Sequence, residues 1–259
     1  MNVVFFGSTS DSVLVLQKLE GVVAVVTQPP RPNPTPVESW AHEKNISVTT
    51  LDAVTPFKPD LLICASYGEK IPIEIIESTT FGGLNVHPSL LPRWRGADPV
   101  PWAILTGDHQ TGVTVVTLSR EFDQGNIIAQ KKVAITDGDF ADPLRTKLFE
   151  MGAQLLIEAL PDYISGKNKG VPQKIENEPY AKRFTRDDGF EPWEKIIDPK
   201  ENNRINRKLR ALHPWPGLWT MFKDKRLKIL AFDSIPVIVQ LEGKKPVSYE
   251  QFTKAYKVA

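Results

Sequence analysis

The sequence contains little cysteine, little histidine and no long hydrophobic run, and each shortage excludes a class of protein. Cys64 is the single cysteine in 259 residues, so no disulfide can form within the chain, which fits the reducing cytoplasm. The four histidines and this cysteine lack metal-ligand spacing, so we expect no metal. No apolar run reaches membrane-spanning length, and the first residues lack the basic start of a signal peptide. We therefore expect a soluble, cytoplasmic protein, a monomer without a membrane partner.

Charge is balanced over the whole chain, with a net value of +1, but it is unevenly distributed. Residues 1–180 carry 15 Lys and Arg against 21 Asp and Glu, a net charge of −6, whereas residues 181–259 carry 17 against 10, a net charge of +7. A basic C-terminal part favours a polyanionic partner, because neutralised phosphates provide most sequence-independent affinity for nucleic acid. A solvated lysine-rich surface without a partner would have the same composition. Charge alone therefore does not distinguish a nucleic-acid-binding surface from a merely solvated one.

Apolar runs that alternate with amphipathic stretches predict an α/β fold. Residues 3–6 and 22–27 have the character of buried strands, and the amphipathic stretch between them completes a right-handed βαβ unit. The turn after the first strand has one glycine where the dinucleotide fingerprint needs three, so we expect a Rossmann-like, doubly wound, mostly parallel sheet without a bound nucleotide. Cys64 lies in another buried run, residues 61–65, where an inert thiol is expected.

The stretch of residues 83–96 places several polar side chains directly after an apolar strand. Asn85 and His87 are two residues apart in an extended segment, so both point to the same side of the strand. A neutral imidazole can accept a proton near neutral pH and a side-chain amide can donate to an oxyanion, so the pair suits attack on a carbonyl. Asp123, in the loop after the next strand, is the candidate that holds the imidazole. An Asn-x-His pair can also serve only to tie down a turn.

Four short motifs follow one another along the chain, namely Asn85-x-His87, Ser89-Leu90-Leu91-Pro92 with Gly96 after it, Thr111-Gly112-Val113-Thr114, and Asp123-x-Gly125. In this order they resemble the signature of enzymes that transfer a formyl group from 10-formyltetrahydrofolate. The resemblance covers nearly the whole chain. The segment Arg93-Trp94-Arg95-Gly96-Ala97 and the C-terminal third are most similar to the branch of this family that formylates methionyl-tRNA.

The resemblance implies transfer of the formyl group of 10-formyltetrahydrofolate to the amino group of initiator methionyl-tRNA. In it, His87 would be the general base, Asn85 would donate to the oxyanion, and Asp123 would orient the imidazole. The folate donor would lie against Ser89, Leu90, Leu91, Pro92, Gly96 and Tyr67. The tRNA would be bound by basic residues, namely Arg31, Arg93, Arg95, Arg207 and Lys208.

Two features depart from that branch and keep other functions open. The proline-rich loop of residues 28–36 retains one basic residue, Arg31, where these enzymes usually have a longer basic loop. Asp11 stands where they commonly have a phenylalanine near the methionyl side chain. An amino-sugar nucleotide is therefore the alternative acceptor. Hydrolysis of the folate donor, formylation of glycinamide ribonucleotide and a non-enzymatic nucleic-acid-binding module are further alternatives.

Loss of periodicity after the long amphipathic helix of residues 142–164 predicts the domain organisation. We expect a catalytic domain over residues 1–178, a linker over 179–201 and a basic domain over 202–259. The resemblance implies that the last of these is a reduced β-barrel of the oligonucleotide-binding type, because its middle strands are short or missing. We expect Trp215, held between two prolines, to be a rigid packing residue.

Overall fold

The computed structural model describes residues 1–29 and 32–257. The chain forms two compact units, each described separately below. The first consists of Met1–Pro99, Gln110–Ala134 and Arg145–Ala181, and the second of Val100–His109, Ile135–Leu144 and Lys182–Ala259. The change from one unit to the other after Ala181 falls inside the segment expected to be a linker.

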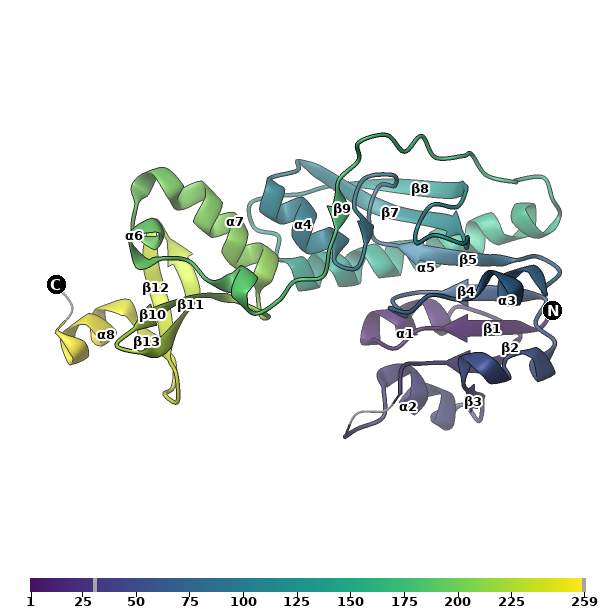
Figure 1. The fold of residues 1–259 in the computed structure, drawn as a ribbon, viewed down its shortest axis with the longest axis horizontal. Coiled ribbons are helices and arrows are strands. Elements are labelled where there is room, and N and C mark those ends of the chain that lie inside the picture. The colour runs from purple at the N-terminus through teal and green to yellow at the C-terminus, as the bar shows by residue number, and fades with distance from the viewer. Residues whose placement is uncertain (30–31, 258–259) are drawn as a thin grey trace. The chain divides into compact units, whose positions relative to one another are not determined.

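A seven-stranded sheet forms the centre of the first unit, with the strand order β3-β2-β1-β4-β5-β7-β8 (Figure 1). The five strands from β3 to β5 are parallel, whereas β7 pairs antiparallel with both of its neighbours. This confirms the predicted mostly parallel sheet. The strands are β1 (Val3–Phe6), β2 (Val22–Val26), β3 (Ser47–Thr49), β4 (Leu61–Cys64), β5 (Gly83–His87), β7 (Gln110–Thr117) and β8 (Ile127–Ala134).

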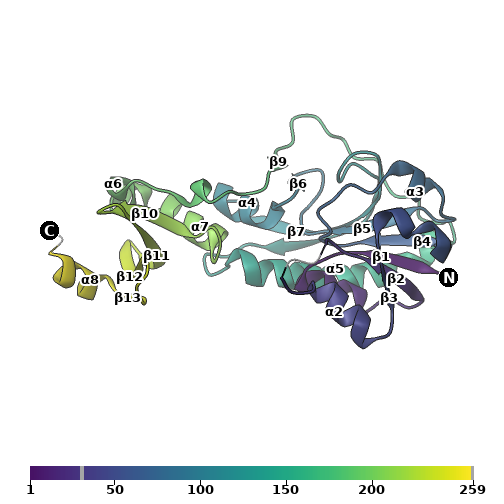
Figure 2. The same ribbon diagram turned by 60° about the horizontal axis from the view of Figure 1, so that its bottom comes forward.

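Helices cover both faces of this sheet, with α1, α2 and α5 on one side and α3 on the other (Figure 2). Capping boxes begin two of them: the Thr9 hydroxyl accepts from the backbone of Ser12, and that of Thr35 accepts from the backbone of Glu38. A small parallel pair, β6 with β9, completes the unit. The bounds are α1 (Ser10–Leu16), α2 (Pro36–Glu43), α3 (Ile73–Glu77), α5 (Ala141–Ile164), β6 (Arg95–Gly96) and β9 (Tyr180–Ala181), with short 3-10 helices at Leu51–Ala53 and Thr55–Phe57.

The contact of α5 with the sheet determines which side of β5 remains for a site. A Cβ on Gly152 of α5 would lie 2.5 Å from Val86 and 2.7 Å from Val113, so only glycine allows this close approach. Because side chains alternate along a strand, Asn85 and His87 point to the face opposite α5. The helix thus occupies one face of β5 and leaves the polar face to the loops.

Asp11 anchors α1 to α5 and is buried. Its carboxylate accepts a hydrogen bond from Arg145 Nε at 2.6 Å and another from the Thr146 hydroxyl at 2.9 Å. Both carboxylate oxygens of Asp11 are therefore used within the fold.

The second unit has a four-stranded antiparallel sheet in the order β10-β11-β12-β13, packed against α7 and α8. Apolar residues of α7, Ile205 and Leu209, and Phe252 of α8 share one core with the buried side chains of the strands. The sheet is open, with β10 and β13 at its edges, which agrees with the expected reduction of a barrel. The bounds are α4 (Pro99–Thr106), β10 (Leu218–Phe222), β11 (Lys225–Asp233), β12 (Ile235–Leu241), β13 (Val247–Ser248), α6 (Trp193–Ile196), α7 (Asn202–Leu212) and α8 (Tyr249–Tyr256), with 3-10 helices at Asp187–Gly189 and Pro199–Glu201.

The expectation for Trp215 was wrong. Its side chain is 59% exposed, so it packs little, and the neighbouring His213 instead makes an edge contact with Phe140 at a ring distance of 5.5 Å. Among the residues that the structure describes, no helix is both long enough and apolar enough to cross a bilayer.

Candidate active site

The structure brings Asn85, His87 and Asp123 together at the end of β5. One carboxylate oxygen of Asp123 accepts from Asn85 Nδ2 at 3.0 Å and lies 3.5 Å from His87 Nδ1. The other accepts from the backbone N–H of Gly96 at 2.9 Å. The side chains of His87 and Asp123 are 5% and 8% exposed, so the charge is held away from bulk water. Electrostatic interactions are stronger in such a place than at the surface.

The remaining nitrogen of His87 determines which tautomer is present. Nε2 lies 2.9 Å from the backbone carbonyl oxygen of Trp94, and a carbonyl can only accept a hydrogen bond. Nε2 therefore carries the proton in the neutral ring, and Nδ1 is the nitrogen that can accept one. The carboxylate of Asp123 faces this nitrogen, so it stabilises the imidazolium that forms when Nδ1 takes up a proton.

Two residues of this cluster have backbone conformations that L-amino acids rarely adopt. Asp123 has φ of 56° and Trp94 has φ of 61°, both in the left-handed region. Such conformations persist where surrounding contacts enforce them, and they concentrate at functional sites. Gly96, with φ of 111°, is required for a further reason, because a Cβ there would lie 2.6 Å from the ring of Tyr180 and 2.7 Å from the carbonyl of Ala181.

The loop that follows β5 is braced from β7 and β8. The Thr114 hydroxyl donates to the carbonyl of Ser89 at 2.7 Å and accepts from the backbone N–H of Leu91 at 3.2 Å. Gln130 Nε2 donates to the Leu91 carbonyl at 2.8 Å. The Ser89 hydroxyl donates to the Arg93 carbonyl at 2.8 Å. The loop is therefore held as one preformed piece.

The residues expected to contact the folate donor are this loop, Gly96 and Tyr67. Ser89 and Leu91 are buried, and their polar groups are hydrogen-bonded to Arg93 of the loop and to Thr114 and Gln130 of the neighbouring strands. Leu90 and Pro92 are half-buried and Gly96 donates to Asp123. Tyr67 packs edge-on against Phe6 at a ring distance of 5.4 Å, and burial raises the pKa of its phenol to about 12. The ring of Tyr67 is thus part of the core.

Cys64 ends β4 directly beside Asn85 on β5. Burial, together with the negative charge of Asp123, raises the pKa of its thiol to about 12. The thiol therefore stays protonated at neutral pH, in agreement with the expected inert side chain. Cys64 of β4 and Val116 of β7 are the two strand partners of Asn85, so the ends of β4 and β7 lie on either side of β5. In open α/β sheets, ligands bind at the carboxyl ends of the parallel strands.

The basic residues expected to bind the acceptor fall in different environments. Arg31 lies outside the described residues. The guanidinium of Arg93 lies over the ring of Trp94 at 4.6 Å. Arg95 Nε and Arg207 Nε are both buried and have no hydrogen-bond partner in the described part of the chain.

The structure contradicts the prediction that Lys208 contacts the acceptor. Its ammonium lies 2.7 Å from a carboxylate oxygen of Glu191 and 2.7 Å from the carbonyl of Phe190, and the residue is buried. A basic helix contains both exposed and core-facing cations, and charge counting does not distinguish them. Lys208 is therefore removed from the candidate acceptor contacts.

Three contacts of the site were not found from the sequence. The carbonyl of Trp94 and the N–H of Gly96 are backbone groups, which leave no residue signature. Gln173, in the irregular segment after α5, donates from Nε2 to the carbonyls of Asp123 and Gly125. Among the described residues, no group of three or more His, Cys, Asp or Glu side chains is arranged to hold a metal ion.

Comparison with known proteins identifies relatives along most of the chain. Residues 1–160 match the family model described as formyl transferase, and residues 194–236 match the one described as formyl transferase, C-terminal domain. The methionyl-tRNA formyltransferase of Listeria monocytogenes serotype 4a (strain HCC23) is 37% identical over 246 residues, which cover 88% of this chain and 77% of that protein. The enzyme of the same name from Halalkalibacterium halodurans is 36% identical over 249 residues, again 88% and 77%.

Solved structures share the fold at lower sequence identity. The N-formyltransferase from Helicobacter canadensis, in complex with folinic acid and dTDP-3-aminofucose, superposes with a TM-score of 0.72 at 18% identity, covering 96% of this chain and 98% of that one. A sugar N-formyltransferase from Shewanella sp. FDAARGOS_354 has a TM-score of 0.71 at 18% identity, covering 89% and 97%. At this identity the likeness concerns the fold alone.

Proposed function

Because the chain belongs to the formyl transferase family, we propose that it transfers the formyl group of 10-formyltetrahydrofolate to the amino group of methionyl-tRNA. The observation that carries this proposal is the buried cluster in which one carboxylate, that of Asp123, faces both the amide of Asn85 and the imidazole of His87. Relatives named methionyl-tRNA formyltransferase at 36–37% identity support the choice of acceptor.

The chemistry requires a base that takes a proton from the attacking amine. The amine nitrogen attacks the formyl carbon, and His87 Nδ1 accepts the proton that the amine loses. The resulting imidazolium is stabilised by Asp123. When the bond between the formyl carbon and the folate nitrogen breaks, that nitrogen takes the proton, and His87 returns to its neutral form.

The oxyanion of the tetrahedral intermediate needs a donor that is already in place. Asn85 Nδ2 uses one N–H for Asp123, so its second N–H is the one that can donate to the oxyanion. The same carboxylate therefore orients both the donor and the base. Removal of a single oxyanion donor commonly costs about 10² to 10³ in rate.

A place for the folate donor follows from the strand ends. The loop after β4 contains Ser66 with φ of 52° and Gly68 with φ of 83°. It contacts the Asp123 loop, because Lys70 Nζ lies 3.4 Å from a carboxylate oxygen of Glu121. We place the pterin between these two loops. The donor contacts predicted at Ser89, Leu90, Leu91 and Pro92 remain part of this proposal.

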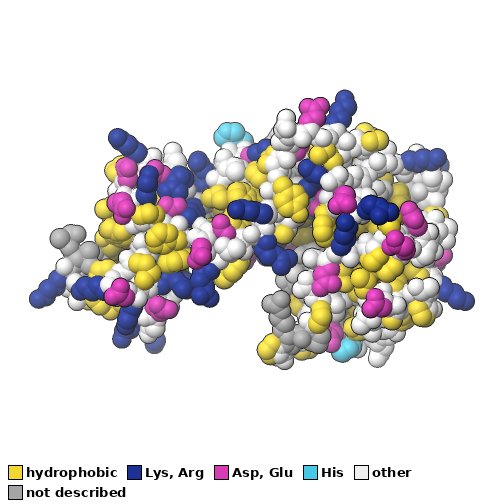
Figure 3. Space-filling view, viewed as in Figure 1, with side chains coloured by type: hydrophobic (Ala, Val, Ile, Leu, Met, Phe, Trp, Pro, Cys, Tyr) yellow, Lys and Arg dark blue, Asp and Glu magenta, His cyan; other side chains and the backbone are white. Residues whose placement is uncertain are grey.

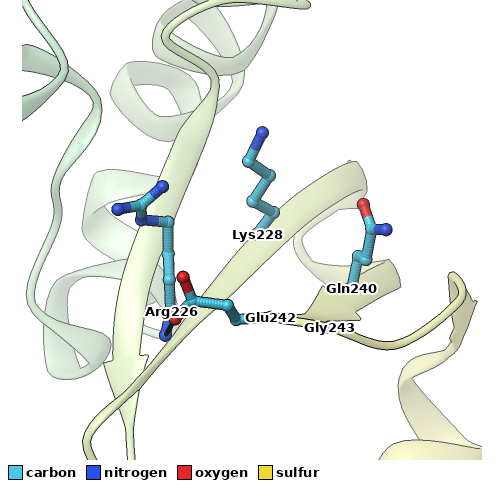
Figure 4. Close-up of a pocket in the computed structure, with 5 residues that line it drawn as sticks. All are labelled: Arg226, Lys228, Gln240, Glu242 and Gly243. Carbon is cyan, nitrogen blue, oxygen red and sulfur yellow. Dashed lines mark hydrogen bonds between the residues drawn. The ribbon is translucent and has the colours of Figure 1, made fainter.

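The outer face of the second unit's sheet is our candidate for contact with the tRNA. The guanidinium of Arg226 lies 4.9 Å from the centre of the Trp219 ring, and Lys228 is the cross-strand neighbour of Trp219. Figure 4 shows Arg226, Lys228 and Gln240 rising from the same side of β11 and β12 around a shallow hollow that Glu242 and Gly243 also line. Cations beside an aromatic ring suit both the phosphates and the bases of RNA.

The distribution of charge over this unit supports the same partner. On the face shown in Figure 3, Lys and Arg side chains lie over the C-terminal elements together with hydrophobic side chains and fewer acidic ones. Part of the excess of Lys and Arg in residues 181–259 is thus exposed on this face.

A comparison of acceptors tests the proposal. Purified protein with 10-formyltetrahydrofolate should formylate charged initiator methionyl-tRNA, with uncharged tRNA as the control. A dTDP-linked 3-amino sugar tests the alternative acceptor, and donor loss without an acceptor tests hydrolysis. Turnover with the amino sugar and none with methionyl-tRNA would show that the acceptor is an amino sugar. Binding of tRNA without turnover of the folate would show that the protein is not a formyltransferase.

A further inference from the structure

The segment of residues 165–181, which follows α5, is irregular but is tied to both loops of the active site. Figure 1 shows it running from the end of α5 along β7 and β8 to β9. At its far end the backbone N–H of Trp94 donates to the carbonyl of Pro179 at 3.2 Å, and that of Ala97 donates to the carbonyl of Ala181 at 2.8 Å. We call this segment the strap.

Midway along the strap, Gln173 contacts the second loop. Its Nε2 donates to the carbonyl of Asp123 and to the carbonyl of Gly125, both at 2.8 Å. Both partners can only accept, so the orientation of the amide is determined. Its Oε1 is buried and has no hydrogen-bond partner in the described part of the chain. In the described part of the chain, both N–H groups of the Gln173 amide thus donate to the loop, whereas its oxygen accepts no hydrogen bond.

These two bonds act on the residue whose backbone is least favourable in the loop. Asp123 has φ of 56°, where a side chain with a Cβ is disfavoured, and in this conformation its carboxylate contacts Asn85, Gly96 and His87. A clamp on the carbonyls of Asp123 and Gly125 holds the peptide plane between residues 123 and 124 and the plane between residues 125 and 126. The first of these planes sets the ψ angle of Asp123, one of the two backbone angles that direct its carboxylate.

We propose that Gln173 is a positioning residue for formyl transfer, which holds Asp123 in its left-handed conformation and thereby places the carboxylate that serves Asn85 and His87. This inference rests on the proposed function for its kinetic consequence, but the clamp itself can be tested without any substrate. Gln173 then acts on the active site although it contributes no group to the reacting atoms.

The test compares the near-isosteric Gln173→Met, which removes both donors, with Asn168→Ala as a matched control. Asn168 Nδ2 also ties the strap to the body of the unit, donating to the carbonyl of Ile128 at 3.1 Å, but it does not touch the Asp123 loop. Gln173→Met should lower kcat about 10- to 100-fold with little change in KM, because small misplacements of catalytic groups cost this much. Asn168→Ala should retain the wild-type kcat.

A double-mutant cycle separates positioning from general loosening. In an Asp123→Asn background, Gln173→Met should cause no further loss, because the carboxylate through which it acts is gone. A full additional loss in that background, or equal losses for Gln173→Met and Asn168→Ala, would overturn the proposal. Gln173→Glu, which places an acceptor against two carbonyls, gives a second variant of the same size if Gln173→Met does not fold.

A substrate-free readout distinguishes failure of this inference from failure of the proposed function. The imidazole NMR signals of His87, assigned with a His87→Asn variant, should move in Gln173→Met toward their positions in Asp123→Asn and should not move in Asn168→Ala. Wild-type signals in Gln173→Met would overturn the clamp even if the enzyme formylates methionyl-tRNA. A shift with no formylation of any acceptor would retain the clamp and remove the proposed reaction.

Discussion

His87 Nε2 lies 2.9 Å from the carbonyl oxygen of Trp94, and this contact leaves Nδ1 as the basic nitrogen of the ring. The assignment has a direct consequence for catalysis, because Nδ1 is also the nitrogen that faces Asp123. The base and the carboxylate that stabilises its charged form are therefore on one side of the ring.

Replacement of His87 by alanine should lower the formylation rate by about 10² to 10⁴, the usual contribution of a positioned general base. Binding of the folate donor should change little, because the ring is buried beneath the loops. Single-turnover formylation and equilibrium binding of a folate analogue measure the two effects. Circular dichroism serves as the folding control, and near-wild-type turnover would show that another group is the base.

Reversal of Arg226 and Lys228 to glutamate should weaken tRNA binding and reduce its dependence on salt, by about one in the logarithmic slope for each lost phosphate contact. The value of kcat at saturating tRNA should remain, because neither residue belongs to the unit that contains His87. Lys254→Ala is the control, since Lys254 is an exposed cation of the same unit that pairs with Glu250. Filter-retention assays at several salt concentrations measure the tRNA affinity of both variants. Unchanged affinity would show that this face does not contact the tRNA.

Replacement of Gly152 by alanine should destabilise the first unit by up to about 2 kcal/mol. Alanine favours a helix by about 1 kcal/mol over glycine, but overpacking a core costs about 1–3 kcal/mol. The new Cβ would lie 2.5 Å from Val86, a stiff buried side chain directly behind Asn85 and His87. Urea unfolding measures the change. Gly138→Ala, where the nearest atom is 3.8 Å away, should be neutral, and equal stability of both variants would contradict the close packing.

The carboxyl group of Glu191 makes the stability of the second unit depend on pH. Burial alone would raise the pKa of Glu191, but hydrogen bonds from Arg204 and Lys208 hold it below its ordinary value. The folded state thus favours the carboxylate, so this stabilisation is present above the unfolded pKa of about 4.3 and is lost as the pH falls through the folded one. Glu191→Gln leaves the buried Lys208 without its counter-ion and should cost on the order of 3 kcal/mol at pH 7.

The measurement is urea unfolding of both proteins at pH 7 and below pH 4. The difference between wild type and Glu191→Gln should shrink as the pH falls, because protonated glutamic acid and glutamine are both neutral. Glu194→Gln in the same unit is the control for a loss of charge without these partners. A difference that stays constant with pH would show that the interaction is not between charges.

The sequence was sufficient for the local features of this fold. Buried apolar runs such as residues 3–6 determine the strands, and the alternation of side chains along β5 places Asn85 and His87 on one face whatever the rest of the chain does. Similarity of short motifs also identified Asp123 as their partner, and the loop that carries it follows β7, the antiparallel neighbour of β5.

Sequence reasoning was wrong where the outcome depended on which groups face one another. Lys208 was counted with the exposed cations of its helix, but Glu191 neutralises it in the interior. The hydrogen bonds by which Thr114 and Gln130 hold Ser89 and Leu91 from the neighbouring strands were not predicted. Trp215 was expected to be buried, but it is exposed.

By itself, the sequence determined the order of strands and helices, the family, and the identity of the amide, imidazole and carboxylate, because these follow from local periodicity and from residue type. Only the tertiary structure decided the tautomer of His87, the left-handed backbone of Asp123 and the role of Gln173. These depend on backbone carbonyls of Trp94, Asp123 and Gly125, and a backbone group has the same chemistry at every position until folding brings it to a particular partner.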